Sequence, residues 1–414
     1  TLGEVVPSAY HALRQALASG QQAALNAVPL GGVTKLTNPQ AAYAYQLEGA
    51  DSHHLGMPAA PALSSAWCAA EMTEVYWRAW TRDIAFIDYD THPHIAAAAA
   101  DLNALSDYRG PRTASGVTAG TIFRGVTPGD LTGPFISQFL YLDIPFGGTP
   151  MPQRYRTIMA GDNHMTSYSD WLAVQNGAAP PRAALFDPSH RYISTGRDLA
   201  EFVHHDFSFQ AYQSAALILL GFGAAAIDDN NPYKHYANQN SFVTFGGPMV
   251  LDLVARAAMS AFKAAWYQKW LVHRRLRPEA YGGLVHHKIN GSANYPLHPD
   301  ALNSAVLPLI QGAYGTSLLP MAFPEGCPTH PAYPAGHATI AGACVTVLKA
   351  FFKESYTIPN PVQSNADGLS LMPFNGPLTV GGELNKLAAN ISHGRDTAGV
   401  PWRTDGIGGR LLGE

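Results

Sequence analysis

The sequence predicts a mainly α-helical protein with long loops and few short strands. Several long segments repeat apolar residues at the period of an α-helix, whereas no series of alternating strand patterns and no βαβ rhythm occurs. Hydrophobic residues make up 47% of the 414 residues and charged residues only 14%. Ordinary globular proteins carry about a quarter charged residues. We therefore expect a large buried core rather than a disordered chain.

The helical period is clear in several segments, which we expect to form the main helices: residues 66–84, 95–105, 198–226, 249–276, 336–353 and 383–400. Long connections rich in Gly, Pro and Asn separate them, and loops of this length usually carry function or cover a neighbouring subunit. Neither an internal repeat nor a change in composition divides the chain. The sequence thus predicts a single domain over residues 1–414.

Charge and hydropathy argue against two broad classes of partner. Lys and Arg total 26 and Asp and Glu total 30, so the net charge is −4 and there is no basic excess to attract nucleic acid. The longest apolar run, Ala215 to Ile227, is shorter than the roughly 20 residues of a membrane span. We expect neither a nucleic-acid nor a membrane partner.

The three cysteines, Cys68, Cys327 and Cys344, form no CxxC pair for zinc and allow one disulfide.

Charged residues continue the apolar face of the helix predicted over 249–276. Its stripe runs through Leu251, Val254, Ala258, Phe262 and Ala265 to Lys269 at nearly the same phase. Arg277 directly precedes Pro278, which should end the helix. A buried Lys needs a partner, and the alternative is a long side chain that reaches along the surface to water. For Arg274 and Arg275 we prefer that alternative, a solvated pair.

Two later helices repeat this pattern. The apolar stripe of the helix over 383–400 leads to Arg395, for which a structural Arg paired with a core carboxylate is the alternative. The helix that begins at Gly336, after Pro334, places His337 in its first turn on the core-facing side. A satisfied core His is the alternative there. Free backbone N–H groups and the positive end of the helix dipole make such an N-terminus a ready anion site.

Together these features predict a site for a multivalent anion. Lys269, Arg277, Arg395, a helix N-terminus and His337 all face inward, and so much positive charge is tolerable only when an anion neutralises it. Donors on several sides suit a tetrahedral oxyanion such as phosphate or vanadate.

At these residues the sequence resembles the vanadium-dependent haloperoxidases of the type 2 acid phosphatase superfamily, and in particular the bromoperoxidases of marine algae. The superfamily signature is a Lys, an Arg-Pro, the motif PSGH, and an Arg followed six residues later by His. The matching positions are Lys269, Arg277-Pro278, Pro334-Ala335-Gly336-His337 and Arg395, with Pro401 in the last place. Wider blocks such as WYQKW, THPAYPAGHAT, GGELNKLAANI and DGIGGRLLGE match as well, so the resemblance covers nearly the whole chain.

The resemblance implies a fold of helical bundles with the core of the oxyanion site over residues 198–401. It implies a vanadate cofactor held by side chains and one backbone N–H, at Lys269, Arg277, Arg395 and Gly336. In relatives, a hydroxyl stands at the position of Ala335 and a His that bonds vanadium stands at the position of Pro401. Phosphate or sulfate can take the place of vanadate.

The resemblance also implies roles for the residues around the cofactor. His337 would be the acid–base residue, His330 a second catalytic His, and Lys269 would bond the peroxide and make it more electrophilic. Asp206 would pair with the vanadate-binding arginines, and Trp266 would lie near the vanadate.

The implied activity is oxidation of bromide or iodide by hydrogen peroxide to hypohalous acid, which halogenates small organic acceptors. The family further implies a homo-oligomer, a dimer or a dodecamer, and a secreted, periplasmic or cell-wall location. Two alternatives stay open. One is an acid phosphatase or phosphotransferase, in which the last His is the nucleophile. The other is a non-catalytic oxyanion-binding homologue.

Two positions depart from the family pattern and weaken the expected site. Ala335 lacks the hydroxyl, and a lost hydrogen bond to a charged group costs about 1.5–3 kcal/mol. Pro401 has no nitrogen that could coordinate vanadium. The nearest His, His393, stands two residues before Arg395 and should face away from the site. A deliberately altered sequence, a naturally degenerate site and a changed helix end that brings in another ligand are the three explanations.

Two further clusters could bind metal ions. Asp228 and Asp229 begin an Asp-Asp-Asn-Asn run that could hold calcium through oxygen ligands, although we prefer an ordinary turn at a helix end. His204 and His205 could also bind a metal, although packing around the oxyanion site is the preferred interpretation.

Overall fold

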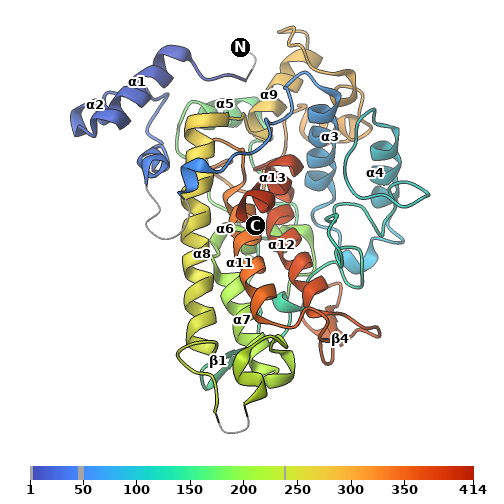
Figure 1. Ribbon diagram of the computed structural model, residues 1–414. Helices are drawn as coiled ribbons and strands as arrows, with labels where there is room; N and C mark the ends of the chain where they lie inside the picture. The colour runs from blue at the N-terminus through green and yellow to red at the C-terminus, as the bar shows by residue number, and fades with distance from the viewer. Residues whose placement is uncertain (1–2, 45–50, 237–238) are drawn as a thin grey trace.

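The computed structural model describes residues 3–44, 51–236 and 239–414, and these residues confirm a mainly helical fold (Figure 1). A bundle around α11 (Gly336–Phe351) occupies the centre. This helix packs against α8 (Gly247–Tyr267), α12 (Val380–Thr397) and α13 (Arg403–Gly413). Because α11 touches helices on several sides, its N-terminus opens into the interior rather than to the surface.

The other helices surround this bundle or extend from it: α1 (Pro7–Ser19), α2 (Gln22–Asn26), α3 (Ala66–Thr81), α4 (Pro93–Ala104), α5 (Tyr168–Gln175), α6 (Gly196–His205), α7 (Gln210–Gly221), α9 (Pro278–Ile289) and α10 (Val306–Tyr314). The helices α1 and α2 project to one side of the molecule (Figure 1). Strands are few and short, as expected. β1 (Ile144–Phe146) pairs antiparallel with β2 (Thr149–Met151), and β3 (Val362–Ser364) pairs antiparallel with β4 (Leu371–Pro373).

Two expected helices differ from the structure. The helix predicted over 198–226 is broken, because α6 ends at His205 and Asp206 is extended (φ −64°, ψ 142°) before α7 begins. The helix predicted over 249–276 is α-helical only as far as Tyr267 and then widens into a π-helical segment over Gln268–His273. Such π-helical turns are frequent at functional sites. Both breaks lie beside residues that the sequence had marked as site residues.

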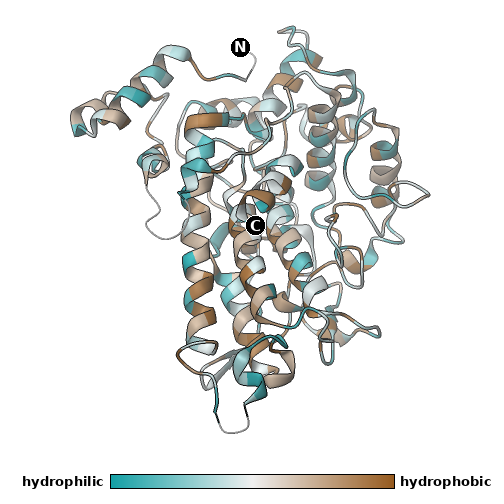
Figure 2. Cartoon of the chain, viewed as in Figure 1, coloured by the Kyte–Doolittle hydropathy of each residue, from teal (hydrophilic) through white to brown (hydrophobic). Residues whose placement is uncertain are grey.

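The main hydrophobic core runs through the central bundle and includes buried residues from Cys68 to Trp402. Hydrophilic and hydrophobic residues alternate along α8 (Figure 2), as the helical period predicted for a helix with one buried face. Within the described ranges, none of the helices combines the length and the apolar character that crossing a membrane requires. All three cysteines are free, so the disulfide that their number allowed is not formed.

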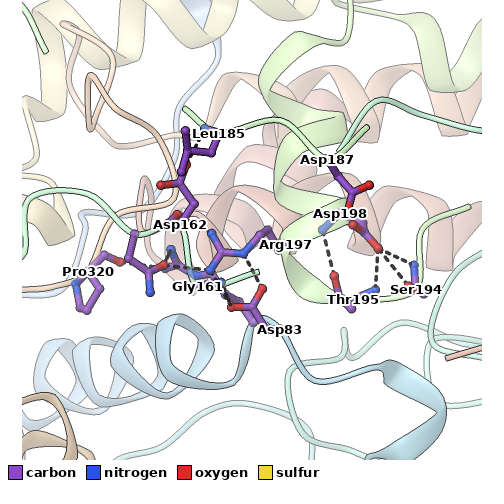
Figure 3. A network of polar contacts seen from close by, with 12 residues as sticks. Asp83, Gly161, Asp162, Leu185, Asp187, Ser194, Thr195, Arg197, Asp198 and Pro320 are labelled. Carbon is purple, nitrogen blue, oxygen red and sulfur yellow. Dashed lines mark hydrogen bonds and ion pairs between the residues drawn. The ribbon is translucent and has the colours of Figure 1, made fainter. Parts of the chain in front are cut away.

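A polar network fixes the N-terminus of α6 (Figure 3). Thr195 caps the helix and forms a capping box with Asp198. Arg197, in the first turn, pairs with Asp83 (Nη2 to Oδ2, 2.7 Å) and donates to the backbone oxygen of Asp162 (2.6 Å). Charge-assisted bonds of this kind are strong when they are buried. The start of α6 is therefore held firmly.

Candidate oxyanion site

One cavity of about 120 Å³ brings the predicted site residues together. It lies where the π-helical segment after α8, the loop before α11 and the end of α12 meet. Its walls include nine residues that the sequence singled out: Trp266, Lys269, Arg277, His330, Ala335, Gly336, His337, Arg395 and Pro401. The convergence of inward-facing cations predicted from helical phase is therefore present in the fold.

Lys269 is buried, with only 1% of its surface exposed. Its ammonium group donates to the backbone oxygens of Pro331 (2.7 Å) and Ala332 (3.0 Å), and within the described ranges no carboxylate lies within ion-pair distance of it. Burial, together with the positive charges of Arg277 and Arg395, lowers the pKa of Lys269 well below its usual value. A bound anion would favour the charged form and raise this pKa again.

The two arginines of the cavity are also held by backbone oxygens rather than by carboxylates. Arg277 donates to His330 O (3.0 Å) and Val400 O (3.0 Å), and Arg395 donates to Val203 O (3.0 Å). Burial lowers the pKa of both, and for Arg395, where the charge of Arg277 adds to the effect, the pKa falls to about 10. Three cations thus surround one small space, and among the described residues none of them has a carboxylate within ion-pair distance. The electrostatic cost of that arrangement is removed only when an anion enters.

The N-terminus of α11 supplies the remaining donors. The helix begins at Gly336, and Ala335 is its N-cap with no side-chain cap bond. A Cβ at Gly336 would lie 3.3 Å from the Trp266 ring, so a larger residue here would press on that ring. The first N–H groups of a helix have no partner within the helix, and here they border the cavity.

His337, in the first turn of α11, is positioned by a carboxylate. Its Nε2 lies 2.9 Å from Oδ1 of the buried Asp206. Because the carboxylate accepts, Nε2 carries the proton and Nδ1 is the nitrogen that can exchange a proton with a ligand. The pairing of Asp206 with the arginines stays a prediction. The hydrogen bond of Asp206 goes to His337, and its negative charge partly offsets the lowering of the Arg395 pKa.

His330 is held neutral beside these cations. His330 Nδ1 lies 3.1 Å from Arg277 Nη2 and 3.2 Å from the backbone oxygen of Pro331. Burial and the charges of Lys269 and Arg277 lower the pKa of His330 well below its usual value. The ring centroid of Trp266 lies 4.9 Å from that of His330. The site therefore contains one neutral His among cations and one His backed by a carboxylate.

Comparisons with known proteins place this site in a family. Residues 249–414 match the family model of the VCPO second helical-bundle domain. The vanadium-dependent bromoperoxidase of Ascophyllum nodosum is 38% identical over the whole chain and 78% of its own length, and that of Corallina pilulifera is 37% identical over 91% of this chain and 74% of its own length. The solved homohexameric vanadate-dependent bromoperoxidase AnII of Ascophyllum nodosum superposes with a TM-score of 0.93, at 34% identity, over 100% of this chain and 75% of its own.

This chain belongs to the vanadium-dependent bromoperoxidase family. Its departures from the family motif lie inside the oxyanion cavity, since Ala335 and Pro401 both line the wall. His393 is buried away from the cavity, as predicted, and its Nδ1 lies 2.7 Å from Asp396 Oδ2. Among the described residues, the cavity contains no imidazole besides His330 and His337. The explanation that a changed helix end brings in another nitrogen ligand therefore finds no support.

Sequence reasoning missed the buried ion pairs that surround this bromoperoxidase-type site. Arg275, expected to be solvated, is buried and pairs with Glu71 (3.0 Å) and Asp405 (2.7 Å). The backbone oxygen of Asp405 accepts from the N–H of Ala335, so this network holds the N-cap of α11. Arg274 is also not simply solvated, because it donates to Tyr10 Oη (2.9 Å). The carboxylate within the apolar run around Glu71 was the available signal for a buried cation partner.

The calcium interpretation of Asp228 and Asp229 is not supported. The Asp229 carboxylate pairs with Lys234 (2.6 Å) and Lys353 (2.7 Å), so ammonium groups stand where a calcium ion would need oxygen contacts. Asp228 accepts from the backbone and the side-chain amide of Asn230, which is the geometry of a turn.

Proposed function

We propose that this protein is a vanadate-dependent haloperoxidase that oxidises bromide or iodide with hydrogen peroxide. The observation that carries the proposal is the set of cations around the cavity, Lys269, Arg277 and Arg395, none of which forms an ion pair with a carboxylate in the described part of the chain. The relatives named above are bromoperoxidases, and the cavity is built from the residues that match their motif.

The donor set fits a tetrahedral oxyanion. The cavity of about 120 Å³ has room for several water-sized groups, such as the oxygens of vanadate, phosphate or sulfate. Lys269, Arg277 and Arg395 would hold the oxygens from the sides, and the N–H of Gly336 would donate from the start of α11. When bound, vanadate supplies a Lewis acid that activates hydrogen peroxide toward attack by a halide without a change of oxidation state.

The remaining residues support this chemistry in separate ways. His337 can take or return a proton at Nδ1, since Asp206 fixes the proton on Nε2. Neutral His330 neither adds to the positive charge nor repels a halide, while the cations attract halide toward the cavity. Trp266 and Phe262 line the apolar side and exclude water. The products of turnover, hypohalous acid or an equivalent, would then halogenate small organic acceptors.

Pro401 sets the expected strength of cofactor binding. Vanadate can be held here only by charge and hydrogen bonds, because no protein nitrogen stands where relatives have the ligating His. We therefore propose weakened vanadate affinity and reduced turnover, with phosphate and sulfate as competitors for the same cavity. This feature also favours a second candidate, an oxyanion-binding homologue without turnover. A phosphatase is disfavoured, because Pro401 removes the nucleophile that this reaction needs.

Bromination of monochlorodimedone with added vanadate and hydrogen peroxide tests the proposal, together with calorimetric binding of vanadate and phosphate. We expect slow bromination that Arg395→Ala abolishes and that Arg256→Ala, a change at an exposed residue of α8, leaves intact. Binding of vanadate without any bromination would support the non-catalytic homologue, and the absence of both would refute the oxyanion assignment. Since the solved relative AnII is a homohexamer, we also expect a homo-oligomer, which light scattering can measure.

A further inference from the structure

A second group of ligand-type side chains lies on the last turn and a half of α6, outside the oxyanion cavity. Glu201, His204 and His205 have the spacing i, i+3 and i+4, which places them on one face of the helix. Their ligand atoms all lie within 4.8 Å of one another, and among the described residues this is the group of three whose geometry could hold a metal ion. It borders a separate cavity of about 430 Å³.

The distances within the group suit a small metal ion. Glu201 Oε1 lies 2.9 Å from His205 Nδ1, and Glu201 Oε2 lies 3.5 Å from His204 Nδ1. Zinc bonds nitrogen and oxygen ligands at about 2.0–2.1 Å, so tetrahedral neighbours stand about 3.3 Å apart. The two measured separations bracket that value. His205 is half exposed, so its ring can turn to complete the geometry.

The surroundings of His204 already resemble the support of a metal ligand. Its Nε2 lies 2.5 Å from Oε1 of Glu325, while its Nδ1 faces Glu201. Its ring also stacks on Phe323, with centroids 3.7 Å apart and planes inclined by 7°. Histidines that bind metals commonly donate their second N–H to a carboxylate, which fixes the tautomer and the ring orientation. Glu325 and Phe323 therefore prepare Nδ1 of His204 for a metal ion.

The charge of the cluster also favours a dication. Glu201 and Glu325 are two carboxylates, and Arg182, the cation in the described cavity wall, is already paired with Asp162 (2.6 Å). The charge of Arg395 also acts on Glu325, from outside this wall. Two neutral imidazoles and a divalent ion would make the group electrically balanced.

We propose that Glu201, His204 and His205 bind a divalent ion of the zinc class, with water from the adjoining cavity in the fourth position. This site is independent of the oxyanion cavity, although it shares α6 with it. Val203, between the proposed ligands, accepts from Arg395, and the Phe323 ring that supports His204 also lies 5.4 Å from the Arg395 guanidinium. An ion here would brace the end of α6 from the outside.

Calorimetry with zinc chloride, on the full chain treated with chelator and dialysed into phosphate-free buffer, tests the site. We expect one zinc per chain in the unaltered protein. His205→Ala should weaken binding at least about 100-fold, and Glu325→Ala, which removes only the second-nitrogen partner, should weaken it about 10–100-fold. His287→Asn is the matched control, because His286 and His287 are also adjacent but have no place in the cluster. This control should bind zinc as the unaltered protein does.

Cobalt gives an independent spectroscopic readout. Bound Co²⁺ should show the intense visible bands of a four-coordinate nitrogen and oxygen site, and His205→Ala should abolish them. Since His205 and Glu325 are both about half exposed, their loss should leave the far-UV circular dichroism unchanged. Absence of zinc binding by the unaltered chain would overturn the proposal, and so would undiminished binding by His205→Ala. Neither result bears on halide oxidation, so the two proposals fail separately.

Discussion

Introducing a hydroxyl at the start of α11 should raise both the free energy of unfolding and the affinity for an anion, by different amounts. In Ala335→Ser, the introduced oxygen can accept from the N–H of Ala338, as an N-cap does, while its proton is donated to an anion in the cavity. The cap alone should raise the free energy of unfolding of the anion-free protein by about 0.5–2 kcal/mol. The bond to a charged oxyanion should add about 1.5–3 kcal/mol to binding. That gain corresponds to an affinity about 10- to 150-fold higher.

Urea denaturation without anion measures the first quantity, and calorimetry with phosphate or vanadate measures the second. Ala343→Ser is the control, since Ala343 lies in α11 but outside the cavity wall. It should give neither gain. A more stable Ala335→Ser protein with unchanged anion affinity would mean that the α11 N-terminus does not face the bound oxyanion, and it would refute the placement of the anion at that helix end.

The other predictions concern the missing ligand, the buried cations and the network behind them. Pro401→His should strengthen vanadate binding about tenfold or more and leave sulfate affinity nearly unchanged, because only vanadium can accept a nitrogen ligand. Equal gains for both anions in parallel titrations would contradict this prediction. Sulfate keeps its charge over the pH range of interest. Its affinity, measured by calorimetry, should therefore fall as the pH rises through the lowered pKa of Lys269, because the ammonium group loses its charge. In Lys269→Met the affinity should no longer show this fall. Arg275→Met should lower the free energy of unfolding by about 3–5 kcal/mol, because it strands two buried carboxylates. The same change at the exposed Arg256 should cost less than about 1 kcal/mol, and similar midpoints for both in urea denaturation would speak against the network.

The oxyanion site could be predicted because its cations lie on regular helices. Lys269 falls on the apolar stripe of α8 since the helix stays α-helical to Tyr267, and the π-helical segment begins only one residue before it. Arg395 lies within α12, where the period holds throughout. In both cases the phase of a single helix is enough to assign the direction of a side chain.

Features that depend on distant partners could not be predicted in this way. Asp206 is the extended residue at the break between α6 and α7, and it accepts a hydrogen bond from His337, which is 131 residues away in the sequence. Arg275 is buried because Glu71 and Asp405, 204 and 130 residues away, surround it. Local periodicity contains no information about such contacts, so the sequence predicted a continuous helix in the first case and a solvated side chain in the second.

A lone buried cation does not identify an anion site in this fold, and the arrangement around the cavity differs in kind. Arg82 is also buried, and among the described residues no carboxylate lies within ion-pair distance of it. It donates to the backbone oxygen of Pro320 (2.8 Å) and the side chain of Asn163 (3.2 Å), and burial lowers its pKa to about 9. Backbone oxygens likewise accept from Lys269 and Arg395, but these two residues and Arg277 all line one cavity, where their charges repel one another. A fold that only needed these helices to pack would gain stability by losing one of these charges. The three buried cations around one small space are therefore the feature that supports our proposal of an anion in this cavity.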